Sequence, residues 1–175
     1  GRPAGGGEAG RGVVGGDFGA RNKLSTIPPF DNAQIEALSR FLGECGTGSE
    51  ISRVLQDRGL VDHSGESTKW RRLYWVFQYY QNKYKCANHV LDFIRAFLAP
   101  ARFIDRPEEF EEHRQELNKI LVFSGLEYGP DGQFRQVNAV TTLDEAEKRV
   151  QTIRAKLKGL VSTQRSPRGV KVLPN

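Results

Sequence analysis

The sequence predicts a mainly α-helical fold, a bundle of five to six helices with a helix-turn-helix-like unit and one short β-hairpin, flanked by flexible tails. Apolar residues recur at steps of three and four along most of the chain, which is the spacing of helices with one buried face. Residues that favour helix starts precede these runs, and glycine or proline follows them. A Pro-Asp-Gly run at 130–132 stands between two short alternating segments, which is typical of a tight hairpin.

The two ends of the chain differ in composition from its middle. Residues 1–29 hold eight glycines in the first sixteen positions, which makes ordering costly, so we expect a disordered tail. Residues 162–175 are rich in Ser, Pro, Gly and basic residues and predict a second, basic tail. Between them we expect a helical domain over 30–125 and a hairpin plus amphipathic helix over 126–161. The sequence holds no methionine, which indicates a fragment or a reading frame that starts elsewhere.

The first two helices are predicted by their start and stop residues. Asp31 is a good N-cap for the first helix, which Gly43 ends. Thr47 or Ser49 can cap the second helix, and Gly59 stops it. The predicted inner faces are Ile35, Leu38, Phe41 and Leu42 on the first helix, and Ile51, Val54 and Leu55 on the second.

The third helix, over about 67–84, is predicted to be the central one, because apolar and aromatic residues cover nearly its whole circumference. Asn88 is expected to cap a fourth helix that Pro100 ends. A fifth helix should begin at Pro107, with acidic residues in its first turns, and end before Gly125.

The last predicted elements are a hairpin over 126–137 and a final helix that opens with Thr142 and Glu145 as a capping box. The apolar residues of this helix form one narrow seam, as in a coiled coil. They are Leu143, Ala146, Val150, Ile153, Leu157 and Leu160. A seam this narrow predicts a partner helix, so these residues are the candidate partner-binding site.

The net charge of +5 points to nucleic acid only if it lies on the folded body. The three parts 1–29, 30–137 and 138–175 carry net charges of +2, −2 and +5, so the middle of the chain is not basic. Within it the charges still separate, because 69–85 holds five cations and no acid, whereas 105–116 holds six acids.

Two interpretations of the basic, aromatic third helix stay open. In the first it is a recognition helix whose cations contact phosphates while one ring stacks on a base. The residues of this nucleic-acid-binding alternative are Lys69, Arg71, Arg72, Tyr79 and Lys83. In the second interpretation the rings belong to the core and the cations face the acidic fifth helix.

No set of residues predicts a catalytic or metal site. His63, His89 and His113 fall on separate elements without a neighbouring nucleophile pattern. Cys45 and Cys86 are too few for a disulfide framework, and we expect both to be reduced and buried. We therefore predict no catalytic residue, no metal and no cofactor. No apolar run approaches the roughly 20 residues of a membrane span, and we expect a cytoplasmic protein.

The segment from 114 to 158 carries a pattern of spaced leucines, glycines and a Thr-Leu-Asp-Glu-Ala run. Its positions are Leu117, Asn118, Leu121, Phe123, Gly125, Leu126, Asp131, Gly132, Val137, Thr142, Leu143, Glu145, Ala146, Arg149 and Leu157. This pattern resembles the linker region of a family of bacterial proteins called Ymh-type or abortive-infection-like. Segments 48–51 and 68–70 resemble the N-terminal helical region of the same family, so the resemblance covers about residues 30–158.

In that family a C-terminal helical domain related to the HEPN nucleases follows the pattern, but the present sequence turns into the basic stretch described above. The resemblance therefore implies a non-catalytic interaction or accessory module of a bacterial defence protein, without the nuclease-like domain. Such a module would dock to an effector domain or self-associate through its C-terminal helix. Two alternatives stay open: a helix-turn-helix nucleic-acid-binding domain, and a nuclease-like enzyme in its own right.

Overall fold

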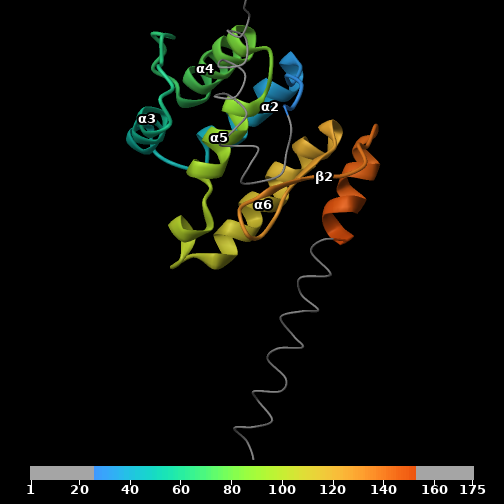
Figure 1. Cartoon of the computed structure of the whole chain (residues 1–175). Helices are drawn as coiled ribbons and strands as arrows, with labels where there is room; N and C mark the ends of the chain where they lie inside the picture. Colours follow the sequence, from blue (N-terminus) through green and yellow to red (C-terminus); the bar gives the residue numbers. More distant parts are fainter. Residues whose placement is uncertain (1–25, 153–175) are drawn as a thin grey trace, which may run out of the picture.

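A computed structural model describes residues 26–152 and shows a mainly helical fold with one two-stranded hairpin, which confirms the predicted mainly α-helical bundle with a short β-hairpin (Figure 1). The elements are α2 (Asn32–Gly43), α3 (Gly48–Asp57), α4 (Lys69–Tyr84), α5 (Asn88–Phe97), the 3₁₀-helix η1 (Pro100–Phe103), α6 (Pro107–Leu121), the 3₁₀-helix η2 (Val122–Ser124), β1 (Leu126–Tyr128) and β2 (Phe134–Gln136). A further helix occupies 143–152 of the described chain.

Helices α2 and α3 begin as their sequences predict. The backbone N–H of Gln34 donates to the Asp31 carboxylate at 2.8 Å. The Gln34 side chain in turn accepts a hydrogen bond from the Asp31 N–H, which completes a capping box. Thr47 and Glu50 form the same arrangement at the start of α3. These contacts satisfy backbone donors that have no partner within the first turn of a helix.

Helix α4 is central, as predicted, and packs against both α2 and α5. Its buried side includes Leu73 and Phe77, and the Phe77 ring meets Phe93 of α5 edge to face at a centroid distance of 5.5 Å. The helix is not buried all round, however. Trp75 and Tyr79 stay on its outer side.

Two predictions were wrong, one about the start of the fourth helix and one about the end of the N-terminal tail at residue 29. Asn88 is not an N-cap, because Ala87 holds that position and the Asn88 side chain instead accepts a hydrogen bond from the Ile27 N–H at 2.9 Å. Ile27 is itself buried in the core, so the folded body begins before residue 30. The physical reason is that an apolar side chain and a buried amide partner compensate for ordering this segment.

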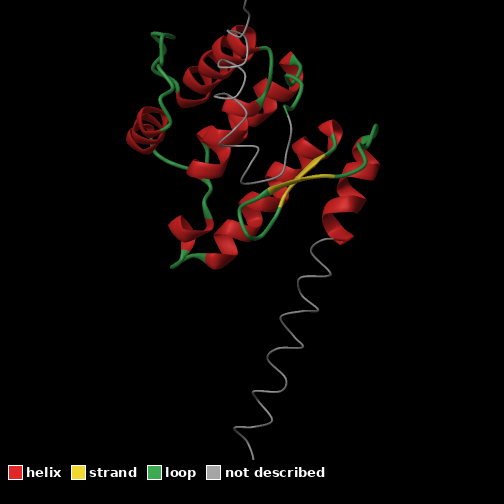
Figure 2. Ribbon diagram, viewed as in Figure 1, coloured by secondary structure: helices red, strands yellow, loops and turns green. Residues whose placement is uncertain are grey.

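The hairpin pairs β1 with β2 in antiparallel register, with Leu126 opposite Gln136 and Tyr128 opposite Phe134. It lies alongside α6 (Figure 2), and Leu126, Tyr128 and Phe134 are part of the same apolar core as the helices. The hairpin is therefore packed on the helical body.

The predicted helix-turn-helix-like unit over 47–81 is not formed. Such a motif joins its helices by a turn of about three to four residues, whereas the whole of 58–68 separates α3 from α4. Helix α3 packs on α5, and α4 packs on α2. Within the described chain, no helix combines the length and apolarity needed to cross a bilayer.

Candidate functional site

The outer side of α4 carries large aromatic residues in solvent. Trp75 is 50% exposed and Tyr79 is 42% exposed. They are four residues apart and therefore neighbours on one helix face, while Leu73 and Phe77 point into the core. Because bulky rings are normally buried, adjacent exposed rings indicate a contact surface.

A hollow of about 510 Å³ adjoins these rings. One wall is α4, which contributes Trp75 and Tyr79, and the other is the segment between α3 and α4, which contributes His63 and Glu66. The His63 and Tyr79 rings lie 5.4 Å apart between centroids, so the two walls touch at this point. The volume lies within the range of small-ligand and side-chain pockets.

A second, smaller hollow of about 290 Å³ lies beside the first. Trp70 and Tyr74 line it together with Arg71. Trp75 and Glu66 line both hollows and thus form the ridge between them. We call the two hollows together the α4 groove.

The segment that forms the second wall of the α4 groove is fixed to the body by polar contacts. Arg72, whose side chain is 16% exposed, donates to the Asp62 carboxylate at 2.8 Å and to the Ser52 hydroxyl at 2.8 Å. The Asp62 carboxylate also accepts from the Ser64 N–H and hydroxyl, and the Val61 N–H donates to the Tyr80 hydroxyl at 2.8 Å. The groove is therefore largely preformed.

These contacts predict a specific pH dependence. Burial by itself raises the pKa of Asp62, but hydrogen bonds from Ser64 and Arg72 and the Arg72 charge outweigh it, so the pKa lies below its ordinary value. A carboxyl with a lowered folded-state pKa stabilises the fold above the unfolded pKa of about 3.9, and this contribution is lost as the pH falls through the folded pKa. Asp62→Asn should therefore lower stability at pH 7, and its difference from wild type should shrink below about pH 4.

Urea unfolding followed by circular dichroism at pH 7, 5 and 3 checks this expectation. Asp105→Asn is the matched control, since Asp105 is exposed and forms no ion pair within the described chain. A stability difference for Asp62→Asn that stays constant across the three pH values would contradict the assignment.

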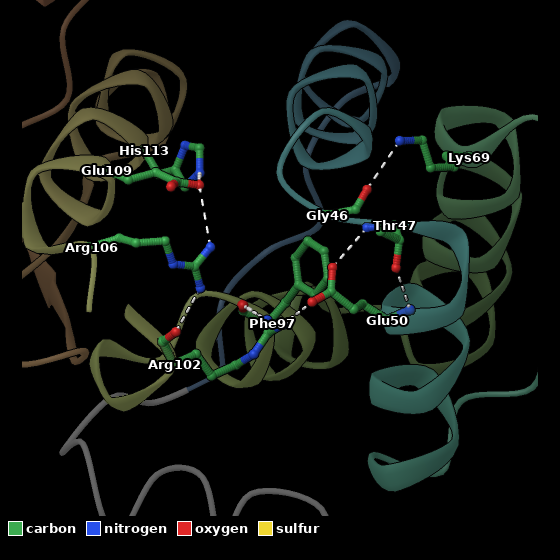
Figure 3. Close-up of polar contacts among 9 residues, drawn as sticks. All are labelled: Gly46, Thr47, Glu50, Lys69, Phe97, Arg102, Arg106, Glu109 and His113. Atoms are coloured by element: carbon green, nitrogen blue, oxygen red, sulfur yellow. Dashed lines mark hydrogen bonds and ion pairs between the residues drawn. The ribbon is translucent and has the colours of Figure 1, made fainter. Parts of the chain in front are cut away.

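Two of the predicted nucleic-acid-binding cations are engaged inside the molecule. The Lys69 ammonium donates to the Gly46 carbonyl at 3.0 Å (Figure 3), and Arg72 is bound as described above. The other three candidates stay at the surface. Arg71 lies 5.5 Å from the Trp70 ring centroid, and Lys83 lies 5.8 Å from that of Tyr79. The structure thus separates the five predicted residues instead of presenting one basic face.

The other interpretation, in which these cations face the acidic fifth helix, was wrong. Arg72 pairs with Asp62, whereas three carboxylates of α6 pair with Arg or Lys side chains on α6 or at the residue just before it. Glu109 lies 3.7 Å from Arg106 and 3.3 Å from His113 (Figure 3), and Glu111 pairs with Arg114 at 2.9 Å. Side chains three and four positions apart on a helix are close enough to form ion pairs. The sequence prediction compared the charges of two separate segments and did not consider pairs within one helix.

The predicted partner-binding seam is only partly described. Ala146 is buried against Val122 and Val140, so it packs within the chain, and Val150 is buried as well. Leu143 is 81% exposed and does not take part in this contact. Ile153, Leu157 and Leu160 lie outside the described residues. Of the described seam residues, Ala146 therefore serves internal packing, whereas Leu143 stays in solvent.

The cysteine and histidine environments do not favour catalysis. Burial, followed by the charges of Glu109 and Glu44, raises the pKa of the Cys45 thiol to about 12, and an un-ionised thiol is a poor nucleophile. Cys86 is buried, and burial lowers the pKa of His89 although Asp92 opposes this. In residues 26–152, no cluster of three or more His, Cys, Asp or Glu side chains is arranged to hold a metal ion.

The sequence analysis identified Tyr79 as a candidate but did not predict that Trp75, His63 and Glu66 line a hollow together with it. The spacing of Trp75 and Tyr79 was visible, but assigning the outer side of α4 required knowing that α2 and α5 cover the other sides. No family model, curated protein or solved structure matches this chain. The resemblance to the abortive-infection-like family stays a prediction.

Proposed function

We propose that this chain is an interaction module that binds a partner protein in the α4 groove. The observation that carries this proposal is the pair of exposed rings, Trp75 and Tyr79, beside a hollow whose other wall is already fixed. Tryptophan and tyrosine are enriched among the residues that dominate binding energy at protein interfaces. A preformed groove also lowers the entropy lost when a partner binds.

The shape of the groove favours a peptide segment over a broad, flat partner surface. Two hollows lie in succession along α4 and share the Trp75 ridge. An extended chain can place one side chain in each hollow and pass its backbone over the ridge. The accessory role in a defence protein, inferred from the 114–158 pattern, would be one setting for such binding.

Nucleic acid fits the groove less well. Glu66 lines both hollows and would repel phosphates, while Lys69 and Arg72 are bound internally. Phosphate contacts supply most of the affinity of proteins for nucleic acid. A duplex DNA titration should therefore detect no binding that weakens with added salt. Salt-dependent binding that Lys69→Ala and Arg72→Ala abolish would contradict this expectation.

A selection of random phage-displayed peptides on the full chain tests the proposal. We expect enriched peptides to bind the Trp75→Ala variant at least about tenfold more weakly, because truncating a central aromatic contact typically removes 2 kcal/mol or more. Tyr84→Ala is the matched control, since Tyr84 is an exposed ring on the same helix that lines neither hollow. Failure to enrich any peptide, or equal loss in both variants, would refute the α4 groove as the binding surface.

A further inference from the structure

The larger hollow combines aromatic faces with a single carboxylate. Trp75, Tyr79 and His63 supply the rings. The faces of tryptophan and tyrosine carry negative electrostatic potential, which attracts cations. Glu66 is the only Asp or Glu among the lining residues, and neither Lys nor Arg lines this hollow.

The Glu66 carboxylate is uncommitted within the described chain. It forms no ion pair and accepts no hydrogen bond there, although its backbone N–H donates to the Ser64 hydroxyl. By contrast, the neighbouring Asp62 carboxylate is satisfied by Arg72 and Ser64. Glu66 is partly buried beside Trp75, so a cation placed there would be attracted by the carboxylate and by the ring.

The same helix already uses this chemistry next to the smaller hollow. The guanidinium carbon of Arg40 lies 3.9 Å from the centroid of the Trp70 ring. Arg40 also pairs with Glu36 at 2.9 Å, and Glu36 lines that hollow. A ring, a cation and a carboxylate thus lie together on the surface of α2 and α4. The larger hollow contains the ring and the carboxylate of a similar set.

We propose that the larger hollow binds a lysine or arginine side chain of the partner peptide. Its aliphatic stem would lie against Trp75 and Tyr79, and its charged head would meet Glu66. This inference rests on the proposed function and names the ligand class for the same groove. Charge complementarity selects a basic side chain over an acidic or neutral one, since both a Coulomb attraction and a cation–π contact would be lost otherwise.

Defined hexapeptides and the full chain provide the test. The probes are acetylated, amidated glycine peptides that carry two lysines, two norleucines or two glutamates. Binding is followed by two-dimensional ¹H–¹⁵N NMR of the Trp75 indole N–H, which is assigned with a Trp75→Phe variant. We expect the lysine peptide to shift this signal at concentrations where the other two do not, and we expect the shift to weaken with added salt.

Glu66→Gln isolates the carboxylate from the shape of the hollow. It should weaken binding of the lysine peptide by about five- to tenfold, which is the fold-change for about 1 to 1.4 kcal/mol. Glu112→Gln on α6 removes the same charge at an exposed position and should leave binding unchanged. Circular dichroism verifies that both variants fold.

The outcomes separate this inference from the function it rests on. Equal shifts with the lysine and norleucine peptides, or equal affinity of Glu66→Gln and Glu112→Gln, would overturn the cationic ligand. Phage-selected peptides that depend on Trp75 but contain no basic residue would do the same and leave the interaction module standing. No shift with any hexapeptide would also count against the cationic ligand.

Discussion

Replacing Asn118 with leucine is expected to lower the free energy of unfolding by about 2–4 kcal/mol. Asn118 is buried on α6. Its side-chain amide forms hydrogen bonds with both the backbone N–H and the backbone carbonyl of Tyr128, as the backbone of a paired strand would. The Tyr128 N–H donates to Asn118 Oδ1 at 2.7 Å, and Asn118 Nδ2 donates to the Tyr128 carbonyl at 3.1 Å. Leucine matches the shape of asparagine but offers neither contact.

The cost arises mainly at the Tyr128 N–H. Tyr128 is fully buried, so water cannot replace the lost acceptor, and an unsatisfied buried donor costs about 1–3 kcal/mol. The carbonyl of Tyr128 keeps a hydrogen-bond partner in the variant, because the buried Arg114 also donates to it, at 2.8 Å. Loss of the Asn118 contacts should therefore loosen the hairpin from α6 before the helices separate.

Urea unfolding followed by far-ultraviolet circular dichroism measures the loss, and hydrogen exchange of the Tyr128 amide locates it. Asn138→Leu serves as the control, since Asn138 is exposed and its side chain forms no hydrogen bond within the described chain. A change below about 0.5 kcal/mol for Asn118→Leu, the usual range for surface substitutions, would show that α6 does not hold the hairpin in this way.

The second large effect is expected from Gln81→Met, at about 2–4 kcal/mol. Gln81 is buried on α4 and pairs with both backbone groups of Phe30. The Phe30 N–H donates to Gln81 Oε1 at 2.8 Å, and Gln81 Nε2 donates to the Phe30 carbonyl at 3.1 Å. Methionine has a similar length and volume, so the variant removes the hydrogen bonds and leaves the packing nearly intact.

Phe30 is buried in the core, so this pairing attaches the segment before α2 to the centre of the bundle. Its loss should raise the hydrogen-exchange rate of the Phe30 amide more than that of the α5 amides. Gln56→Met is the matched control on the exposed side of α3. If both variants unfold at the same urea concentration, the Phe30 pairing contributes nothing measurable to stability.

Local signals in the sequence were sufficient for most element boundaries. Asp31 and Thr47 start their helices through contacts with residues three positions later, and Gly59 occupies a backbone conformation with φ of 72°, which glycine adopts at little cost. The hairpin also follows from its own turn residues. Each of these features depends on neighbours in the chain, so the sequence reveals it directly.

Side-chain partners distant in the chain could not be predicted in this way. Asn88 has the residue type of an N-cap, but its side chain accepts a hydrogen bond from the Ile27 N–H. Gln81 lies in an apolar stripe of the sequence, but its side chain accepts a hydrogen bond from the Phe30 N–H. Lys69 and Arg72 formed a basic run in the sequence, yet each has a partner within the body. A polar residue takes whichever partner the packing of helices brings within about 3 Å, and that distance is a property of the whole fold.

By itself, the sequence determined that the chain is mainly helical, where most helices begin and end, and that α4 is its centre. Only the tertiary structure decided which side of α4 faces solvent, and it folded the segment before α4 back so that Glu66 lines a hollow together with Trp75. The physical reason is that helix formation depends on local hydrogen bonds and periodicity, whereas a binding groove depends on which surfaces the packed helices leave uncovered.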